Sequence, residues 1–312
     1  MRFGLQVPNF SLGVPDAELF DAVTTLATTA EDSGFDSFWV MDHFYQLPAL
    51  GGAAQPMFES YTLLGGLAAR TTSIRLGALV TGVTYRNPAI LAKVVTTLDV
   101  ISRGRAILGI GAAWYDVEHE GLGVDFPPVP ERMDRLEEAV QICRAMFRDE
   151  TPTFAGRYYR VHDARNLPRP VQAGGPPILI GGGGERRTLR LVARYADYCN
   201  ITGDSDTIRH KVSVLHEHCA AEGRDPATVT VSRLSTLVIT DSAEETAATR
   251  ELLRSAVGDD AAGFDVGSED EIVARVEELA AAGVQYCIFN MPTSGPDAVR
   301  RAGRLLTTRF GG

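Results

Sequence analysis

Two side chains that can handle protons stand next to each other where the second predicted strand ends. Asp42 and His43 follow the apolar run Ser37 to Met41. A carboxylate beside an imidazole can bind a polar ring and move a proton, because the imidazole changes its charge near neutral pH. The alternative is a pair that hydrogen-bonds internally and only fixes the following loop. The position at a strand end makes Asp42 and His43 our candidate catalytic residues.

Four consecutive glycines form a second candidate site. Gly181 to Gly184 follow the apolar strand Pro177 to Gly181 and lead into a helix predicted from Glu185. Main-chain N–H groups at a helix start, unhindered by side chains and aided by the helix dipole, can hold a phosphate. The loop has no Lys-Ser/Thr partner, which excludes a Walker P-loop. We expect a phosphate cradle here, and the alternative is a flexible loop that makes a tight turn.

Two further strand ends carry residues that suit a ligand. The third predicted strand, Ile74 to Val80, is followed by Arg86, which can clamp an anion or form an ion pair within its loop. The fourth ends in glycines followed by Ala112 and Ala113, whose small side chains leave the main chain open to a planar ligand. Trp114 occupies the last position of the dinucleotide fingerprint GxGxxG, so a Rossmann site is not supported.

The remaining polar clusters predict neither a metal centre nor a hydrolase. Residues 116–120 include Glu118 and His119 but lack HExxH spacing, so we expect a polar loop with a solvated surface there. The histidines and cysteine of residues 216–219 do not share one helix face, which favours surface or packing roles. The sequence has no GxSxG segment that would supply a serine nucleophile.

The elements that would position these residues alternate along the chain. Short apolar runs alternate with segments of helical spacing, a pattern that predicts βα units around a parallel sheet. The predicted strands are Arg2 to Val7, Ser37 to Met41, Ile74 to Val80, Arg105 to Ile110, Pro177 to Gly181, Tyr198 to Ile201, Val229 to Ile239 and Gln285 to Asn290. The predicted helices are Asp16 to Ser33, Glu59 to Thr71, Pro88 to Ser102, Glu131 to Phe147, Glu185 to Tyr195, Thr207 to Glu222, Ala243 to Ala256, Asp270 to Ala281 and Gly295 to Arg309. Eight units fit a closed (β/α)8 TIM barrel better than an open doubly wound sheet, which is the alternative.

The length favours one domain with insertions. No low-complexity linker divides residues 1–312, and a minimal barrel of about 250 residues leaves a surplus of roughly 60. The surplus falls mainly in residues 44–58, 114–130 and 148–176, most of it after strand ends. We therefore expect insertions at the C-terminal rim that form the walls and lid of a substrate pocket. Residues 153–161 resemble a small hairpin.

Composition narrows the choice of partners and compartment. The 45% of hydrophobic residues is typical of a soluble globular protein, and a net charge of −10 opposes binding to nucleic acid or to an anionic membrane. The four cysteines form no CxxC pair, which favours buried thiols in a reducing cytoplasm. No run of 18 apolar residues and no signal-peptide pattern occurs, so we expect a cytoplasmic protein.

Taken in order, these segments resemble the luciferase-like monooxygenase superfamily, and in particular its branch that depends on coenzyme F420. The resemblance covers nearly the whole chain. The matching segments are Phe3 to Asn9, Asp42 to Phe44, Leu76 to Ala89, Arg103 to Arg105, Leu108 to Tyr115, Phe126 to Arg132 and Ile178 to Gly184.

The resemblance implies a (β/α)8 barrel, usually a homodimer, that binds a flavin or deazaflavin at the C-terminal mouth. We expect coenzyme F420, with FMN as the alternative. The residues that the resemblance brings to the cofactor are Asp42, His43, Leu79, Val80, Thr81, Ala112, Ala113, Gly181, Gly182, Gly183 and Gly184. It also implies a non-prolyl cis peptide near Leu79-Val80, in a bulge against one ring face, and phosphate binding by the four glycines.

The implied activity is hydride transfer between F420 and a small organic substrate, with His43 as proton donor or acceptor and Asp42 positioning the ring. The alternatives are an FMN-dependent two-component monooxygenase, which would need a separate reductase, a non-catalytic flavin or ligand carrier, and a non-redox barrel enzyme. Some sugar-phosphate dehydrogenases of the family carry an acidic residue where this chain has Trp114. That difference argues against a glucose-6-phosphate-like substrate.

Overall fold

The strands of the computed structural model form a closed parallel barrel. The structure describes residues 1–258, 263–291 and 295–311. The barrel strands are β1 (Arg2–Val7), β2 (Ser37–Val40), β3 (Arg75–Ala78), β5 (Ala106–Gly111), β8 (Ile178–Gly181), β9 (Tyr198–Ile201), β10 (Thr230–Ile239) and β12 (Tyr286–Asn290). Each pairs in parallel with its neighbour, and pairing between β9 and β10 closes the ring. The predicted (β/α)8 TIM barrel is confirmed, and every predicted strand is present within a few residues of its expected bounds.

Shorter strands decorate this barrel. β4 (Thr81–Gly82) continues the path of the third strand and pairs with the end of β5. β11 (Asp265–Gly267) pairs with the second half of β10, an addition that the sequence pattern did not predict. β6 (Phe154–Ala155) and β7 (Arg160–Val161) form the expected hairpin.

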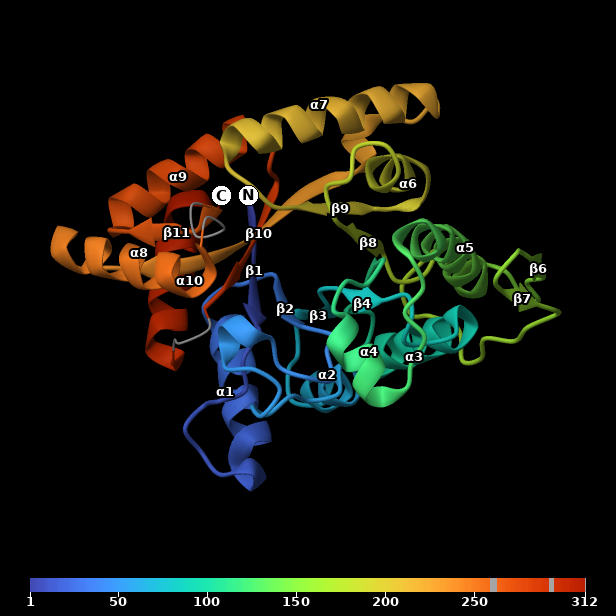
Figure 1. Cartoon of the computed structure of the whole chain (residues 1–312), viewed down its shortest axis with the longest axis horizontal. Helices are drawn as coiled ribbons and strands as arrows, with labels where there is room; N and C mark the ends of the chain where they lie inside the picture. The colour runs from blue at the N-terminus through green and yellow to red at the C-terminus, as the bar shows by residue number, and fades with distance from the viewer. Residues whose placement is uncertain (259–262, 292–294, 312) are drawn as a thin grey trace.

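The helices surround the sheet, as Figure 1 shows. They are α1 (Leu19–Asp32), α2 (Ser60–Ala68), α3 (Pro88–Ile101), α4 (Asp116–Leu122), α5 (Val129–Arg148), α6 (Thr188–Tyr195), α7 (Ser205–Ala221), α8 (Ala243–Val257), α9 (Glu269–Ala281) and α10 (Pro296–Phe310). Single 3-10 turns span η1 (Asp16–Glu18), η2 (Pro48–Leu50) and η3 (Pro226–Thr228). Within the described residues, no helix combines the length and the apolar character that a membrane span requires.

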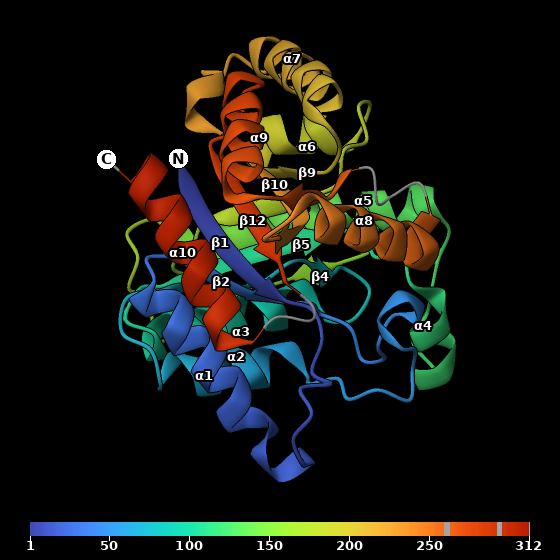
Figure 2. The ribbon, with the colours of Figure 1, turned by 90° about the vertical axis from the view of Figure 1, so that its left-hand side faces the viewer.

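Side-chain chemistry explains several helix boundaries. The Asn87 side chain accepts from the N–H of Ala89 ahead of Pro88, whose missing N–H costs nothing at a first helical position. Ser268 and Glu271 form a reciprocal capping box at the start of α9. The two ends of the described chain lie side by side in Figure 2. The rings of Phe3 and Phe310 pack together there, with their centroids 5.8 Å apart.

Two apolar layers hold the barrel together. A large cluster fills the space between strands and helices, and a smaller one, which includes Trp39, Leu179 and Ile288, fills the barrel interior. All four cysteines are buried free thiols, as expected.

One predicted insertion lies elsewhere than expected. Residues 44–58 and 114–130 do follow β2 and β5 at the carboxyl end of the barrel. Residues 148–176, however, begin where α5 ends, at the amino end, because barrel helices run antiparallel to their strands. This segment packs along the outside of α3, where Asn166 donates to Thr96 Oγ1 (2.8 Å) and the N–H of Val171 donates to Asp99 (2.8 Å). Residues 148–176 therefore cover the barrel wall. A further insertion, made of α8 and β11, follows the end of β10 instead.

Candidate functional site

The imidazole of His43 is held by a buried carboxylate at the carboxyl end of the barrel. His43 follows β2, and its Nδ1 lies 2.7 Å from Oε1 of Glu118 on α4. Burial opposes the charge of Glu118, but hydrogen bonds from His43 and Tyr85 outweigh it and lower the pKa of this carboxyl. Because an ionised carboxylate only accepts, Nδ1 of His43 carries the proton and Nε2 is left free for a ligand.

Glu118 collects more donors than His43 alone. Its Oε2 accepts from the main-chain N–H groups of Phe44 (2.6 Å) and Tyr45 (3.2 Å), and the Tyr85 hydroxyl donates to Oε1. Burial and the adjacent Glu118 charge raise the pKa of Tyr85, so its hydroxyl keeps its proton. This carboxylate thus fixes both the ring of His43 and the loop that follows β2.

The prediction of a solvated surface at residues 116–120 holds for Asp116 and Glu120 but is wrong for Glu118 and His119. Glu118 is 0% and His119 is 1% exposed. His119 contacts Thr84 Oγ1 through Nε2 (2.6 Å) and the Tyr115 carbonyl through Nδ1 (2.7 Å). The seven-residue helix α4 turns these two side chains inward and leaves Asp116 and Glu120 outside. The polar composition of the segment predicts exposure, and two adjacent buried residues, Glu118 and His119, give no helical periodicity that would indicate a buried face.

Aromatic rings surround His43. Trp114 and Tyr115 meet its ring edge to face at centroid distances of 5.6 Å and 5.8 Å. Tyr85 stacks on His119 at 4.6 Å. The site therefore has one apolar wall made by the chain that leaves β5, with Trp114 still 62% exposed and able to contact a substrate.

Asp42 is engaged in a different interaction from its neighbour. Its carboxylate accepts a bidentate pair of hydrogen bonds from Arg86 (2.7 Å and 3.0 Å) and one from Ser60 Oγ (2.6 Å). Burial disfavours the Arg86 charge, but Asp42 outweighs this effect and raises the pKa of Arg86. Of the two alternatives for Arg86, the structure shows the ion pair. A contact between Asp42 and a cofactor ring stays a prediction.

The expected bulge follows β3. The Leu79–Val80 peptide is cis, and the Leu79 carbonyl accepts from Nε2 of Gln6 (3.1 Å). The Val80 side chain lies against two glycines at the ends of β5 and β8. A Cβ on Gly111 would stand 2.8 Å from Val80 Cγ2, and one on Gly181 would stand 3.0 Å from Cγ1. Absent side chains at these positions make the room that the bulge occupies.

The glycine loop runs from Gly181 through Gly184, but it does not enter the helix directly. Residues 185–187 form a turn, and α6 begins at Thr188, so the predicted start at Glu185 is wrong. Gly182 has a φ of +117°, which a side chain would strain. A Cβ on Gly183 would meet nothing closer than Lys211 Cε, at 3.8 Å.

These residues fit the phosphate of a cofactor. The nearest atoms to a Cβ on Gly183 are the side-chain ends of Lys211 and Ile201, at 3.8 Å and 3.9 Å, so an anion has room to approach the main-chain N–H groups. Lys211 adds a cation beside the loop, where its Nζ lies 2.5 Å from Glu185 Oε1. Ala112 and Ala113 follow the end of β5, and their small side chains leave space beside the glycine loop. Ala113 has a φ of +60°.

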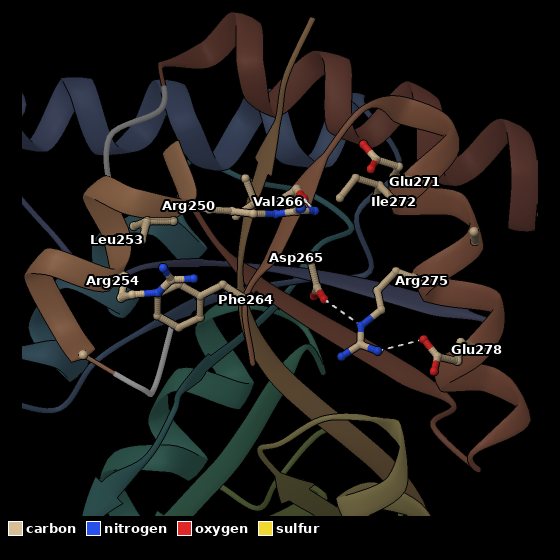
Figure 3. A pocket seen from close by; sticks show the side chains of 12 residues that line it. Arg250, Leu253, Arg254, Phe264, Asp265, Val266, Glu271, Ile272, Arg275 and Glu278 are labelled. Carbon is tan, nitrogen blue, oxygen red and sulfur yellow. Dashed lines mark hydrogen bonds and ion pairs between the residues drawn. The ribbon is translucent and has the colours of Figure 1, made fainter. Parts of the chain in front are cut away.

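A large cavity lies outside the barrel, between elements that follow β10. It measures about 820 Å³ and is lined by α8, β11 and α9. Figure 3 shows Arg275 reaching both Asp265 and Glu278, and Asp265 also pairs with the buried Arg233 (2.6 Å). Asp265 and Glu278 match the charges of Arg233 and Arg275, and this network fastens β11 and α9 to β10.

The structure defines a parallel eight-stranded barrel whose carboxyl rim, where enzymes of this fold carry their active sites, holds an imidazole, a bulge and a glycine loop. A family model described as luciferase-like monooxygenase matches residues 1–257. The chain belongs to the luciferase-like monooxygenase family.

Relatives and solved structures agree with this assignment. An F420-dependent glucose-6-phosphate dehydrogenase of Kineococcus radiotolerans is 39% identical over 51% of this chain and 45% of its own length. A protein of the same name from Microbacterium testaceum is 36% identical over 66% of this chain and 58% of its own. The chain thus spans about half the length of these curated relatives. The F420-dependent tetrahydromethanopterin reductase of Methanopyrus kandleri shares the fold, with a TM-score of 0.81, 20% identity and 99% of both chains covered.

Proposed function

We propose that this protein is an oxidoreductase that transfers a hydride between coenzyme F420 and a small organic substrate. The observation that carries the proposal is the His43 imidazole, held by Glu118 with Nε2 free, at a rim that also has the Val80 bulge and the glycine loop. The names of the relatives, which specify F420-dependent dehydrogenases, support the choice of cofactor.

The chain offers a coherent set of contacts for such a cofactor. Val80 would support one face of the ring, with Leu79 and Thr81 on either side of it. The glycines of residues 181–184 would hold the phosphate, and Ala112 and Ala113 would border the ring and its side chain. When bound, F420 supplies reversible two-electron chemistry at a ring carbon.

His43 supplies the proton transfer in this scheme. With Nδ1–H donated to Glu118, Nε2 can take the hydroxyl proton of an alcohol as it is oxidised, or return a proton in the reverse direction. The resulting imidazolium is stabilised by the Glu118 carboxylate 2.7 Å away. Glu118 touches no reacting atom, so we assign it as a positioning residue. Asp42 retains its proposed place beside the ring through its ion pair with Arg86.

Trp114 bears on the identity of the substrate. It stands where some sugar-phosphate dehydrogenases of the family carry an acid, and its indole packs against His43. We therefore propose a substrate that stacks on an aromatic ring rather than a sugar phosphate. Turnover assays with reduced F420 and enones, imines or nitroaromatics, and with oxidised F420 and alcohols or glucose 6-phosphate, distinguish these classes.

Cofactor titration tests the proposal directly. F420 and FMN are each added to the purified protein while the fluorescence of the cofactor is followed. We expect F420 to bind with micromolar or tighter affinity, and binding of FMN alone would refute the assignment in favour of a two-component monooxygenase. If His43→Ala left turnover unchanged with F420 still bound, His43 would not be the proton-transfer residue. Bound cofactor that no candidate substrate reduces or oxidises would indicate a carrier.

We also propose a cytoplasmic homodimer that needs no separate reductase when it uses F420. Support for the dimer comes from an apolar strip along α3. Its exposed side chains are Ile90, Ile101, Leu167 and Val171. Lys93 and Asp99 on α3 contact the segment that carries the last two. Light scattering coupled to size exclusion measures the mass, and a monomer at micromolar concentration would contradict the dimer.

A further inference from the structure

A cavity of about 520 Å³ opens at the amino end of the barrel, opposite the rim that carries His43. Three arginines line it, Arg75 at the start of β3 and Arg144 and Arg148 near the end of α5, together with one carboxylate, Asp197. We propose that this cavity binds a phosphate group, carried by a small organic phosphate, at a second site distinct from the cofactor loop.

The arginines of this cavity lack carboxylate partners. Among the residues that the structure describes, no Asp or Glu oxygen lies within 4.0 Å of the guanidinium groups of Arg75, Arg144 or Arg148. Arg75 donates to the Tyr198 hydroxyl (2.9 Å), Arg144 to the Tyr195 carbonyl (2.5 Å), and Arg148 to the Gly174 carbonyl (3.2 Å). Each contact orients a cation without neutralising it. Three such arginines converge on one concave surface.

Two further arginines add to the positive potential. Arg2 donates to the Tyr198 hydroxyl (3.2 Å) and to Thr230 Oγ1 (3.1 Å), and both acceptors line the cavity. Arg224 donates to Thr228 Oγ1 (2.8 Å), which also lines it. Burial and the like charges of Arg148 and Arg224 lower the pKa of Arg144, an effect that the Asp197 charge only partly offsets.

The single carboxylate makes no ion pair with these three arginines within 4.0 Å. Asp197 Oδ2 accepts the N–H of Ile178 at 2.8 Å, which ties it to the sheet. In the cavity of about 820 Å³ that α8, β11 and α9 line, by contrast, Arg275 is paired with Asp265 and Glu278. Unmatched cations around a concave surface indicate an anion from outside the chain.

The size and lining narrow the ligand to an organic phosphate. Ligand pockets commonly measure about 300–1,000 Å³, so this volume accommodates more than a bare ion. The guanidinium groups can bind phosphate oxygens, and the Thr230 hydroxyl, which only accepts a hydrogen bond from Arg2, can donate to a polar organic part. Phe147 supplies a buried apolar floor.

Calorimetric titration of the F420-saturated protein tests the site, since saturation occupies the glycine loop. Inorganic phosphate and glycerol 3-phosphate are the probes, against chloride at equal ionic strength. We expect one phosphate site per chain, and about tenfold or greater weakening in R75Q/R148Q, because two charge-assisted contacts are lost. The matched control is Arg209→Gln, an exposed arginine paired with Asp206 on α7. Thermal melting confirms that each variant is folded.

The outcomes separate this site from the proposed cofactor loop. Weakening in R75Q/R148Q but not in Arg209→Gln supports the proposal, and tighter binding of glycerol 3-phosphate identifies the organic part. Equal binding of both probes retains the phosphate site but assigns it to the free ion. No binding beyond chloride, equal weakening by the control, or loss only in Gly183→Ala would overturn it. Failure of F420 to bind at all would refute the proposed function and leave phosphate titration of the unliganded protein to decide this site.

Discussion

Replacing Glu118 by glutamine isolates the role of its charge from that of its shape. The Oε2 atom accepts two main-chain N–H groups, those of Phe44 and Tyr45, and these can only donate. The glutamine must therefore turn its oxygen toward them and its NH2 toward His43 and Tyr85. Facing a donor, His43 must accept at Nδ1 and carry its proton on Nε2. The variant thus forces the opposite tautomer of the neutral imidazole.

The magnitudes follow from these contacts. Two main-chain hydrogen bonds lose their charged acceptor at about 1 kcal/mol each, so we expect Glu118→Gln to cost about 2 kcal/mol of unfolding free energy. The protein stays folded. General acid–base catalysis contributes about 10²–10⁴-fold to rates, and we expect kcat to fall by a factor in that range while the affinity for F420 changes little.

Three measurements check this reasoning. Stopped-flow absorbance of F420 gives the rate, urea unfolding gives the stability, and ¹⁵N NMR of the imidazole reports which nitrogen bears the proton. Glu120→Gln is the matched control, because Glu120 lies on the same helix but is exposed. Two results would refute the positioning role of Glu118. One is an Nδ1–H tautomer that persists in Glu118→Gln. The other is a kcat within about threefold of the native value, because a tenfold change corresponds to about 1.4 kcal/mol and a threefold change to less than half of that.

Three other predictions follow from single contacts. Asp42→Asn should cost about 3–5 kcal/mol of unfolding free energy, because it leaves the buried Arg86 charge poorly compensated. Glu59→Gln changes the more exposed partner of the same arginine and should cost less than about 1 kcal/mol. Urea denaturation measures both costs, and equal values would contradict this account. Gly183→Ala should leave the melting temperature nearly unchanged, since the new Cβ has space, but lower the affinity for F420 at least about tenfold by crowding the main-chain N–H groups. An unaltered affinity in a fluorescence titration would show that this loop does not bind the phosphate. Burial opposes the Glu31 charge, but main-chain N–H groups of residues 72–74 lower the pKa of this carboxyl to about 2. Its contribution to the free energy of unfolding, about 1–2 kcal/mol after solvent screening, is therefore present above pH 4.5 and lost as the pH falls toward 2. Unfolding experiments at pH 6 and pH 3 should show this loss in the native protein but not in Glu31→Gln.

The barrel strands were accessible to sequence analysis because a strand buried on both faces appears as a short apolar run between turn residues. Tyr198–Ile201 has the bounds that the sequence predicted, and the third strand differs because its path breaks at the bulge after Ala78. The extra strand β11 was missed since three residues give no periodic signal. The position of each strand in the ring follows from pairing between distant segments, which a local pattern does not contain.

The candidate site was only half visible for a related reason. Residue type and position at a strand end are enough to predict His43 and the glycines as candidates. Glu118 sits 75 positions from His43 in a segment whose composition is typical of a solvated surface. Only packing of α4 against the loop after β2 reveals that this carboxylate is buried. The same limit applies to Arg86, whose partner could not be chosen between ligand and ion pair without the geometry of Asp42.

The placement of Glu118 on α4 has an evolutionary consequence. The imidazole belongs to the barrel, which members of the family share, whereas its acceptor belongs to a connecting segment, the part of a barrel enzyme that varies most freely. Changes in that segment that remodel the pocket around Trp114 also alter the support of His43. Adaptation to a new substrate and tuning of the proton-transfer step are therefore coupled, and homologues with a different segment after β5 must either keep an acceptor there or supply one from another loop.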